Sequence, residues 1–320
     1  MKDNKIEAIV PEEVEDPAPD GLKAPGFPFD AAKAKQLQGD NPAMEIQLAD
    51  GVSMKFVGIP AGQFVIGSQQ GMPDEQPRAV VEIEKPFWMA VTETTNRQYE
   101  AFDAAHDTRY IDEHGKDHAV PGYIANHANQ PVARVSWQEA MKFCEWLSEE
   151  TGKKVALPSE SQWEWAARAG SEKQFFYGGE NKDFSKWANL ADAGRRRTYC
   201  EFDGGSKVHV RRPYHENSTF PLRDDRFTDK WFIVDYVAQY DPSPFGLFDV
   251  IGNVSEWTRS DYRAYPYKDD DGRNKGDVSG TKVARGGSWN DRPKVTGSTR
   301  RYEYESYQKV YNVGFRVIIE

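Results

Sequence analysis

An oxygen-rich turn from Asp249 to Glu256 is the segment whose residue types best match a known chemistry. It has a carboxylate at each end and Gly252 between them. Glycine lets the backbone turn sharply, so carbonyl oxygens and the Glu256 carboxylate can converge. Calcium binds such oxygens, and the sequence therefore predicts a calcium site here. The alternative is that Asn253 and Glu256 only hydrogen-bond a buried turn anchored by Trp257.

A polar and aromatic segment near the C-terminus is the second candidate. The run from Arg285 to Trp289 (Arg-Gly-Gly-Ser-Trp) opens it, and the Gly-Phe-Arg run that ends at Arg316 closes it. Between them lie tyrosines, arginines and carboxylates, a mixture typical of recognition surfaces. The sequence predicts a binding surface. The alternative is a solvated loop whose tyrosines pack on the scaffold.

The helices that position these segments are marked by their first residues. Each expected helix has an oxygen-bearing cap with Gln or Glu three residues later, which satisfies exposed amides reciprocally. The pairs are Thr95 with Gln98, Ser136 with Glu139, and Ser159 with Gln162. The second helix places Cys144 on its apolar face. The third should end at Gly170, a good left-handed terminator.

Short strands are expected before these helices. Residues 54–60 and 62–67 are apolar runs separated by a turn, residues 81–83 alternate, and residues 87–89 are apolar. They predict a small antiparallel sheet. Beyond Gly170 the pattern is irregular, and loops of such length in a compact domain need ions or burial to hold them.

Length and charge limit the class of protein. A chain of 320 residues with 26 Gly, 19 Pro and 13% aromatics indicates one loop-rich α+β domain, 45–320, after a flexible or draped segment, 1–44. A net charge of −10 excludes non-specific nucleic-acid binding. No stretch is long and apolar enough for a membrane span. The expected location is cytoplasmic as written, or secreted or periplasmic if a signal peptide has been removed.

Three motifs give the chain a family resemblance. They are the segments Leu157–Arg168 and Gly246–Trp257, and the pair Arg285–Trp289 with Gly314–Arg316. In this order they resemble the formylglycine-generating enzyme (sulfatase-modifying factor) family, from about residue 50 to the C-terminus. The resemblance implies a C-type-lectin-like α+β fold with little regular secondary structure and calcium-tied loops.

The same resemblance implies ligands for two calcium ions. The first would be held by the positions matching Asp249, Gly252, Val254 and Glu256, the middle two through backbone oxygens. The second would involve Asn189, Leu190, Asp225 and Phe227. Here Arg226 replaces the glycine that the family pattern expects, and these residues could instead be surface loop residues.

Copper is the cofactor that the resemblance does not support. Catalytic family members hold Cu(I) with two cysteines after the Gly-Gly-Ser-aromatic motif, and in this chain those positions are Asp291 and Thr296. Cu(I) selects thiolates over hard oxygen ligands. The chain has only Cys144 and Cys200, and we expect neither to replace the pair. No copper is expected.

Iron is also disfavoured. His114 and His118 have the spacing of one helix face, and His127 follows. Related sulfoxide synthases bind iron through the histidines of an added helical bundle, which this chain lacks, and Gly115 makes a helix here improbable. We expect exposed loop histidines.

Two functions follow from the resemblance. The first is a non-catalytic, calcium-stabilised module that binds a peptide, glycan or small molecule in a C-terminal groove. The second is a copper-independent oxidative or tailoring enzyme of the same family. No catalytic residue is assigned, and the groove is expected to contain Ser288, Trp289, Asp291, Arg292, Thr296, Arg301 and Arg316.

Overall fold

The computed structural model describes residues 21–39, 43–111, 122–192, 223–231 and 233–320. Cys200, His114, His118 and the segments 1–20 and 40–42 lie outside the described residues. Among the described residues, no helix is long and apolar enough to cross a membrane.

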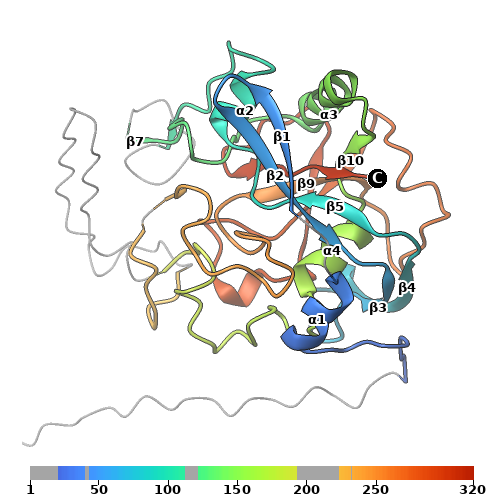
Figure 1. Cartoon of the computed structure of the whole chain (residues 1–320). Helices are drawn as coiled ribbons and strands as arrows, with labels where there is room; N and C mark the ends of the chain where they lie inside the picture. Colours follow the sequence, from blue (N-terminus) through green and yellow to red (C-terminus); the bar gives the residue numbers. More distant parts are fainter. Residues whose placement is uncertain (1–20, 40–42, 112–121, 193–222, 232) are drawn as a thin grey trace, which may run out of the picture.

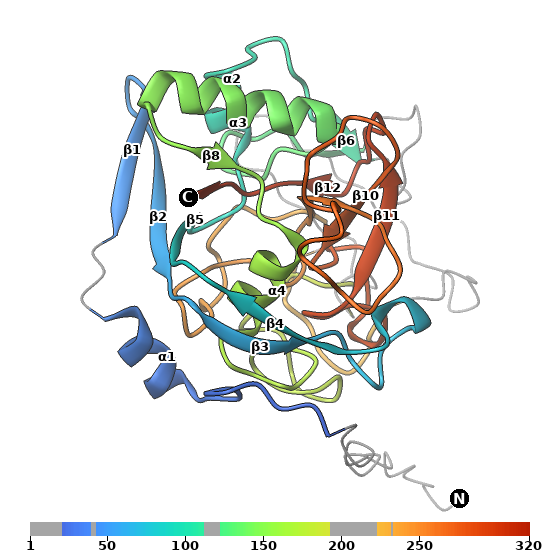
Figure 2. The ribbon, with the colours of Figure 1, turned by 90° about the vertical axis from the view of Figure 1, so that its right-hand side faces the viewer.

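The larger of the two main sheets joins both ends of the domain. Its strand order is β1-β2-β5-β13-β8, and every neighbouring pair is antiparallel. The C-terminal strand therefore lies inside the sheet, between β5 and β8 (Figures 1 and 2). The strands are β1 (Met44–Ala49), β2 (Val52–Ile59), β5 (Phe87–Ala90), β8 (Val155–Ala156) and β13 (Ile318–Ile319).

The runs at 54–60 and 62–67 lie in two different antiparallel sheets. The second run is β3 (Gly62–Ile66), and it pairs with β4 (Ala79–Ile83) in a separate two-stranded sheet. The reason is packing at the corner between β2 and β3. Trp165 donates its indole N–H to the Pro60 carbonyl at 2.8 Å, and a Cβ on Gly62 would lie 2.8 Å from its ring. The indole thus packs against the corner at which the chain passes from one sheet to the other.

All three predicted capping boxes are confirmed. They begin α2 (Asn96–Glu100), α3 (Trp137–Thr151) and α4 (Glu160–Arg168). The last of these ends at Arg168, with left-handed backbone at the following two residues, as a terminator near Gly170 predicts. The side chain of Cys144 is buried within the second core cluster.

A second sheet occupies part of the region that the sequence pattern leaves irregular. Its order is β11-β10-β9-β12, and the pairing of β12 with β9 is parallel. The strands are short and carry many charged residues, so alternation did not reveal them. Their bounds are β9 (Ser255–Asp261), β10 (Thr281–Arg285), β11 (Arg301–Glu305) and β12 (Val313–Gly314). The smaller elements are β6 (Tyr110–Ile111), β7 (Tyr123–Ile124), η1 (Pro73–Glu75) and η3 (Pro293–Val295).

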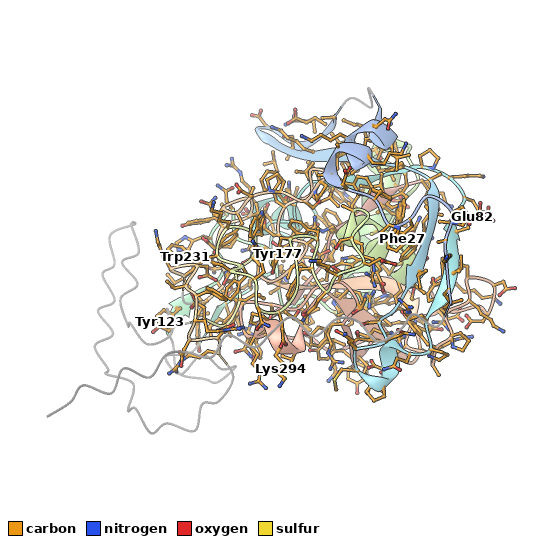
Figure 3. The ribbon with its side chains drawn as sticks, turned by 90° about the horizontal axis from the view of Figure 1, so that it is seen from below. Phe27, Glu82, Tyr123, Tyr177, Trp231 and Lys294 are labelled. Atoms are coloured by element: carbon orange, nitrogen blue, oxygen red, sulfur yellow. The ribbon has the colours of Figure 1, made fainter. Side chains whose placement is uncertain are left out.

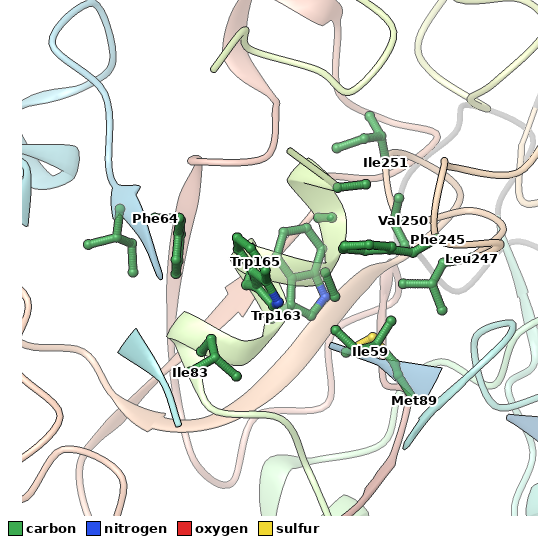
Figure 4. Packing of buried hydrophobic residues seen from close by; sticks show 14 of the residues in the cluster. Ile59, Phe64, Ile83, Met89, Trp163, Trp165, Phe245, Leu247, Val250 and Ile251 are labelled. Carbon is green, nitrogen blue, oxygen red and sulfur yellow. The ribbon is translucent and has the colours of Figure 1, made fainter. Parts of the chain in front are cut away.

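The core contains two large apolar clusters. The first is built around Trp163 and Trp165 of α4, which lie among side chains from β2, β3 and the loop containing Phe245 (Figure 4). The second lies between α3 and the C-terminal segment. In both clusters, packed aromatic rings stabilise loops that form few backbone hydrogen bonds. This explains how a chain with little regular structure remains compact.

Residues 21–39 lie against this domain. Asp30 caps α1 (Ala31–Gln38) by accepting a hydrogen bond from the Lys33 amide. The Phe29 ring lies 5.6 Å from the Trp165 ring, and Phe27 belongs to the first core cluster. This part of the N-terminal segment contributes to the core.

Candidate functional site

The turn from Asp249 to Gly252 crosses the segment that contains Asn189. The Asn189 carbonyl accepts a hydrogen bond from the Asn253 amide at 2.9 Å, and a Cβ on Gly252 would lie 2.2 Å from that carbonyl oxygen. Only glycine fits there, and its φ of +83° also favours glycine. The two predicted calcium segments are therefore in direct contact.

Glu93, which was not predicted as a site residue from the sequence, fixes this crossing. Its carboxylate accepts hydrogen bonds from the Val254 amide at 2.9 Å and from the Asn253 side chain at 2.8 Å. The side chain is completely buried, and burial beside Asp249 raises its pKa well above the usual range. The sequence did contain one indication of this role. Glu93 is a carboxylate that follows an apolar strand and lies two residues before the Thr95 cap.

Glu256 is engaged by protein groups. Arg316 donates to both of its oxygens, at 2.7 and 2.6 Å, and Trp163 donates its indole N–H at 2.7 Å. Glu256 therefore has the role that the alternative interpretation gives it, namely that of a hydrogen-bonding partner within a buried turn. Trp257 is likewise buried, as that interpretation expects.

Asp249 differs from Glu256 because one of its oxygens has no partner. Oδ2 accepts from the Ala238 amide at 2.7 Å, whereas Oδ1 is buried and makes no hydrogen bond. Burial raises the pKa of Asp249 to about 6. Nearby, burial raises the pKa of Asp235 to about 7, with Asp249 adding to the effect. An orphaned buried carboxylate oxygen fits a cation ligand.

The second predicted calcium segment contains a carboxylate that the sequence analysis did not select. Asp229 Oδ2 accepts from the Leu190 amide at 3.0 Å, and Oδ1 accepts from the Trp231 amide at 2.8 Å. Lys230, which lies between Asp229 and Trp231 in the sequence, has a φ of +74°, a backbone conformation that favours glycine. Burial beside Asp192 raises the pKa of Asp229 to about 8.

Asp225, the carboxylate that the resemblance indicates, is directed elsewhere. It is exposed and forms an ion pair with Arg223 at 2.6 Å. Arg226 pairs with Asp224 at 2.7 Å, and the Phe227 ring packs on Phe184. Of the two carboxylates, Asp229 is the one that hydrogen-bonds to the segment containing Leu190.

We define the acid cluster as Glu93, Asp229, Asp235, Asp249 and Glu256, with Arg316. Among the described residues, Arg316 supplies the guanidinium that forms an ion pair in this cluster, and its partner is Glu256. No three described His, Cys, Asp or Glu side chains form a metal-ligating group. An ion in this cluster would thus require backbone carbonyls among its ligands, which calcium accepts.

The two positions that would carry the copper thiols hold oxygen side chains fixed within their loop. Asp291 Oδ2 accepts from the Ser288 amide at 2.9 Å and from the Ser288 hydroxyl at 2.7 Å. Thr296 is buried and donates its hydroxyl to the Gly286 carbonyl at 3.0 Å. Burial raises the pKa of the Cys144 thiol far above its usual range, so this cysteine is not a ready thiolate.

The remaining predicted groove residues do not share one surface. Trp289 is buried in a small third core cluster, and Arg316 belongs to the acid cluster. Arg301 is buried against Glu160. Arg292 is half-buried, and Lys294 on η3 is exposed on the face drawn in Figure 3. The surface around Asp291 and Arg292 is what stays accessible.

Arg301 belongs to a second buried charge assembly, the arginine cluster. Glu160 and Glu164 lie at its centre, and the Glu164 carboxylate accepts from Arg168 at 2.8 Å and also from Arg285. Arg301 donates to Glu160 at 2.6 Å. We define the cluster as Glu160, Glu164, Arg168, Arg273, Arg285 and Arg301. All six residues are buried.

Comparison with known proteins gives consistent matches. The family model described as "Sulfatase-modifying factor enzyme 1-like domain" matches residues 50–320. "Inactive C-alpha-formylglycine-generating enzyme 2" of Bos taurus is 26% identical over 288 residues, which covers 77% of this chain and 80% of that protein. "Formylglycine-generating enzyme" of Mus musculus is 25% identical over 281 residues, covering 73% of this chain and 66% of that protein.

Solved structures show the same architecture. PvdO from Pseudomonas aeruginosa superimposes with a TM-score of 0.61 at 24% identity, covering 88% of this chain and 100% of that chain. Treponema denticola variable protein 1 gives 0.60 at 20% identity, covering 87% of this chain and 98% of that chain. At such identities the likeness concerns the fold, and the predicted mixed α+β fold is confirmed.

Proposed function

Since the chain belongs to the family of sulfatase-modifying factor enzyme 1-like domains, we propose that it is a calcium-stabilised binding module that works without thiolate-bound copper. The observation that carries this proposal is the state of Asp291 and Thr296. Both occupy the positions where the resemblance places thiols, and both are hydrogen-bonded within their own loop. Hard oxygen ligands of this kind do not select Cu(I).

The names of the relatives are compatible with this proposal. One match is a bovine protein whose name includes "Inactive", so the scaffold is found in proteins that are not described as catalysts. Other matches are named formylglycine-generating enzyme. Fold likeness alone does not decide between these functions, so the proposal depends on the residues at positions 291 and 296.

Calcium is the proposed structural ion. At the first site Asp249 would supply its orphaned oxygen, and the carbonyls of Gly252 and Val254 would add neutral ligands. Glu256 would contribute through lone pairs that Arg316 and Trp163 leave available. A divalent cation there would offset the cost of burying the carboxylates of the acid cluster.

At the second site we keep Asn189 and Leu190, the positions that the resemblance implies, and assign the side-chain oxygen of the first and the carbonyl of the second. For the remaining ligands, Asp229 replaces Asp225, and the carbonyl of Trp231 replaces that of Phe227. The hydrogen bond between Asp229 and the Leu190 amide supports this replacement, because it places the carboxylate beside the other proposed ligands.

The accessible surface near Asp291 and Arg292 is the proposed ligand site. Arg292 is half-buried, its buried Nε has no hydrogen-bond partner, and it forms no ion pair with the described residues, so the outer nitrogens of its guanidinium are proposed to meet a peptide, glycan or small ligand. Exposed Lys294 adds a second positive charge. An anionic group on the ligand would be complementary to this surface.

Restoring the thiol pair provides the test. We expect the full chain to fail in competition with a chromogenic Cu(I) chelator, and the double variant Asp291→Cys/Thr296→Cys to gain Cu(I) binding. The matched control is Asp291→Ser/Thr296→Ser. Stoichiometric Cu(I) binding by the unaltered chain, or oxygen consumption with a cysteine-containing peptide, would show that the proposal is wrong.

A further inference from the structure

A hollow of about 250 Å³ lies beside α2 and takes no part in the proposed calcium or groove sites. Its lining includes Arg97, Glu100, Asp103, His106 and Asn126. In Figure 1, α2 lies at the top of the view, whereas the salmon-coloured η3 turn lies near the bottom. The hollow is therefore remote from the loop that carries Asp291 and Arg292.

The walls of this hollow are fixed by hydrogen bonds. Asn96 donates its side-chain amide to the carbonyls of Ala125 and His127, at 3.1 and 3.0 Å. Thr108 donates its hydroxyl to the Asn96 side-chain oxygen at 2.5 Å. These bonds join α2 to the segment on the opposite wall, so the hollow is largely preformed and a ligand need not order it.

Its charged groups come mostly from one helical face. Arg97 and Glu100 are three residues apart, and the turn continues because the Asp103 amide donates to the Tyr99 carbonyl at 2.9 Å. Residues at this spacing are neighbours on a helix surface. The hollow therefore presents a guanidinium, a carboxylate and a second carboxylate in sequence along one wall.

These groups are available to a ligand. Arg97 and Glu100 are exposed and line the hollow, and neither side chain forms an ion pair or a hydrogen bond with the described part of the chain. Asp103 uses Oδ1 to accept from the Ala105 amide at 3.0 Å, which leaves Oδ2 accessible. His106 bonds to the Ala133 carbonyl through Nε2 at 3.0 Å, and burial lowers its pKa, so the ring adds no charge at neutral pH.

We propose that this hollow binds a free basic α-amino acid, with Arg97 holding the α-carboxylate and Glu100 the α-ammonium. The carboxylate and ammonium groups of an α-amino acid are adjacent, as Arg97 and Glu100 are. Asp103, one turn further along, receives the side-chain cation. The lining carries one positive and two negative charges, which complements a ligand with a net charge of +1.

The chemistry favours this ligand over simpler ions. A dicarboxylate would meet two carboxylates in the hollow and be repelled. A diamine would satisfy Glu100 and Asp103 but leave the guanidinium of Arg97 without a partner. Only a molecule with both kinds of group satisfies all three side chains, and charge-assisted hydrogen bonds to them would provide the selectivity.

Calorimetric titration of the full chain at low ionic strength tests the proposal, with L-lysine and cadaverine as probes. Cadaverine has the two amino groups of lysine and lacks the carboxylate. We expect L-lysine to bind at least tenfold more tightly than cadaverine. Arg97→Gln should abolish that preference by weakening L-lysine binding alone. Glu100→Gln should weaken both ligands.

The control is Glu82→Gln on β4, an exposed site at the far edge of the molecule (Figure 3), which should change neither affinity. The proposal is overturned if L-lysine shows no saturable binding up to about 10 mM, which is about ten times a millimolar dissociation constant. It is also overturned if L-lysine and cadaverine bind equally, or if succinate binds more tightly than either.

Discussion

The arginine cluster and the acid cluster handle buried charge in opposite ways, and Trp163 touches both. The indole N–H of Trp163 donates to Glu256 in the acid cluster, while the Arg285 guanidinium lies 5.4 Å from its ring. The arginine cluster surrounds two carboxylates with four guanidiniums. The acid cluster contains five carboxylates, of which Glu256 forms the ion pair with Arg316. In the first assembly both carboxylates accept hydrogen bonds from guanidiniums, whereas in the second the carboxylates outnumber the guanidinium and Asp249 Oδ1 accepts no hydrogen bond from the described residues.

The difference predicts how each region responds to solution conditions. In the arginine cluster, hydrogen bonds between charged partners compensate for the loss of water, so its stability should not depend on metal ions. In the acid cluster, burial raises the pKa values of Asp249, Asp235 and Asp229. Such carboxylates are stabilised by a proton or by a cation. Calcium would supply the missing charge.

Removing a central carboxylate from the arginine cluster should have the largest effect. Glu160→Gln leaves Arg301 and its neighbours buried with less negative charge, and breaking a buried pair typically costs about 3–5 kcal/mol. We expect that loss in urea unfolding followed by tryptophan fluorescence, equally in calcium and in chelator. Glu82→Gln is the matched control. A loss that appears only in calcium would remove the distinction between the clusters.

Asp249→Asn should act in the opposite way. At a free calcium concentration about 100 times the dissociation constant, binding stabilises the native state by about 2.7 kcal/mol, and the variant should lose most of this. In chelator the variant should equal or exceed the unaltered chain, because it removes one buried negative charge. Asp50→Asn, at an exposed position, is the control. Destabilisation that is the same in chelator would indicate a purely structural aspartate.

The second site can be assigned with a pair of variants. Asp229→Asn should weaken one calcium-binding event about tenfold or more, equivalent to about 1.4 kcal/mol, whereas Asp225→Asn should leave calorimetric titrations unchanged. The expected difference arises because Asp229 bonds to the Leu190 segment and Asp225 to Arg223. The reverse result would restore the ligands that the family resemblance implied.

The last prediction concerns pH. Asp235 has its pKa raised to about 7, so the folded state binds its proton more tightly than the unfolded state does. Its contribution to stability is fully present below about pH 4 and is lost as pH rises through about 7. In chelator, Asp235→Asn should reduce the fall in unfolding free energy between these values. Identical pH profiles for the variant and the unaltered chain would refute this contribution.

What the sequence predicted depends on whether the signal was local. Capping boxes act within four residues, and those at Thr95, Ser136 and Ser159 were all recognised correctly. The placement of β13 inside the first sheet depends on contacts with distant strands, and no local pattern indicates it. The strands of the second sheet were also missed, because their buried charged residues hide the alternation of apolar and polar residues.

For the candidate site, too, the sequence predicted what depends on local signals and not what depends on distant contacts. Local glycine geometry indicated the turn at Gly252, and the structure places it against Asn189. Glu93 and Asp229 were missed because their roles depend on which segments cross in space. The predicted groove residues Arg301 and Arg316 have long-range partners, Glu160 and Glu256, that no sequence spacing reveals.

The most direct test of the whole account is the metal content of the full chain after equilibration with calcium and Cu(I) together under reducing conditions, measured by mass spectrometry of the elements. We expect about two calcium ions per chain, matching the two proposed sites, and no stoichiometric copper. One copper per chain, or no retained calcium, would contradict it.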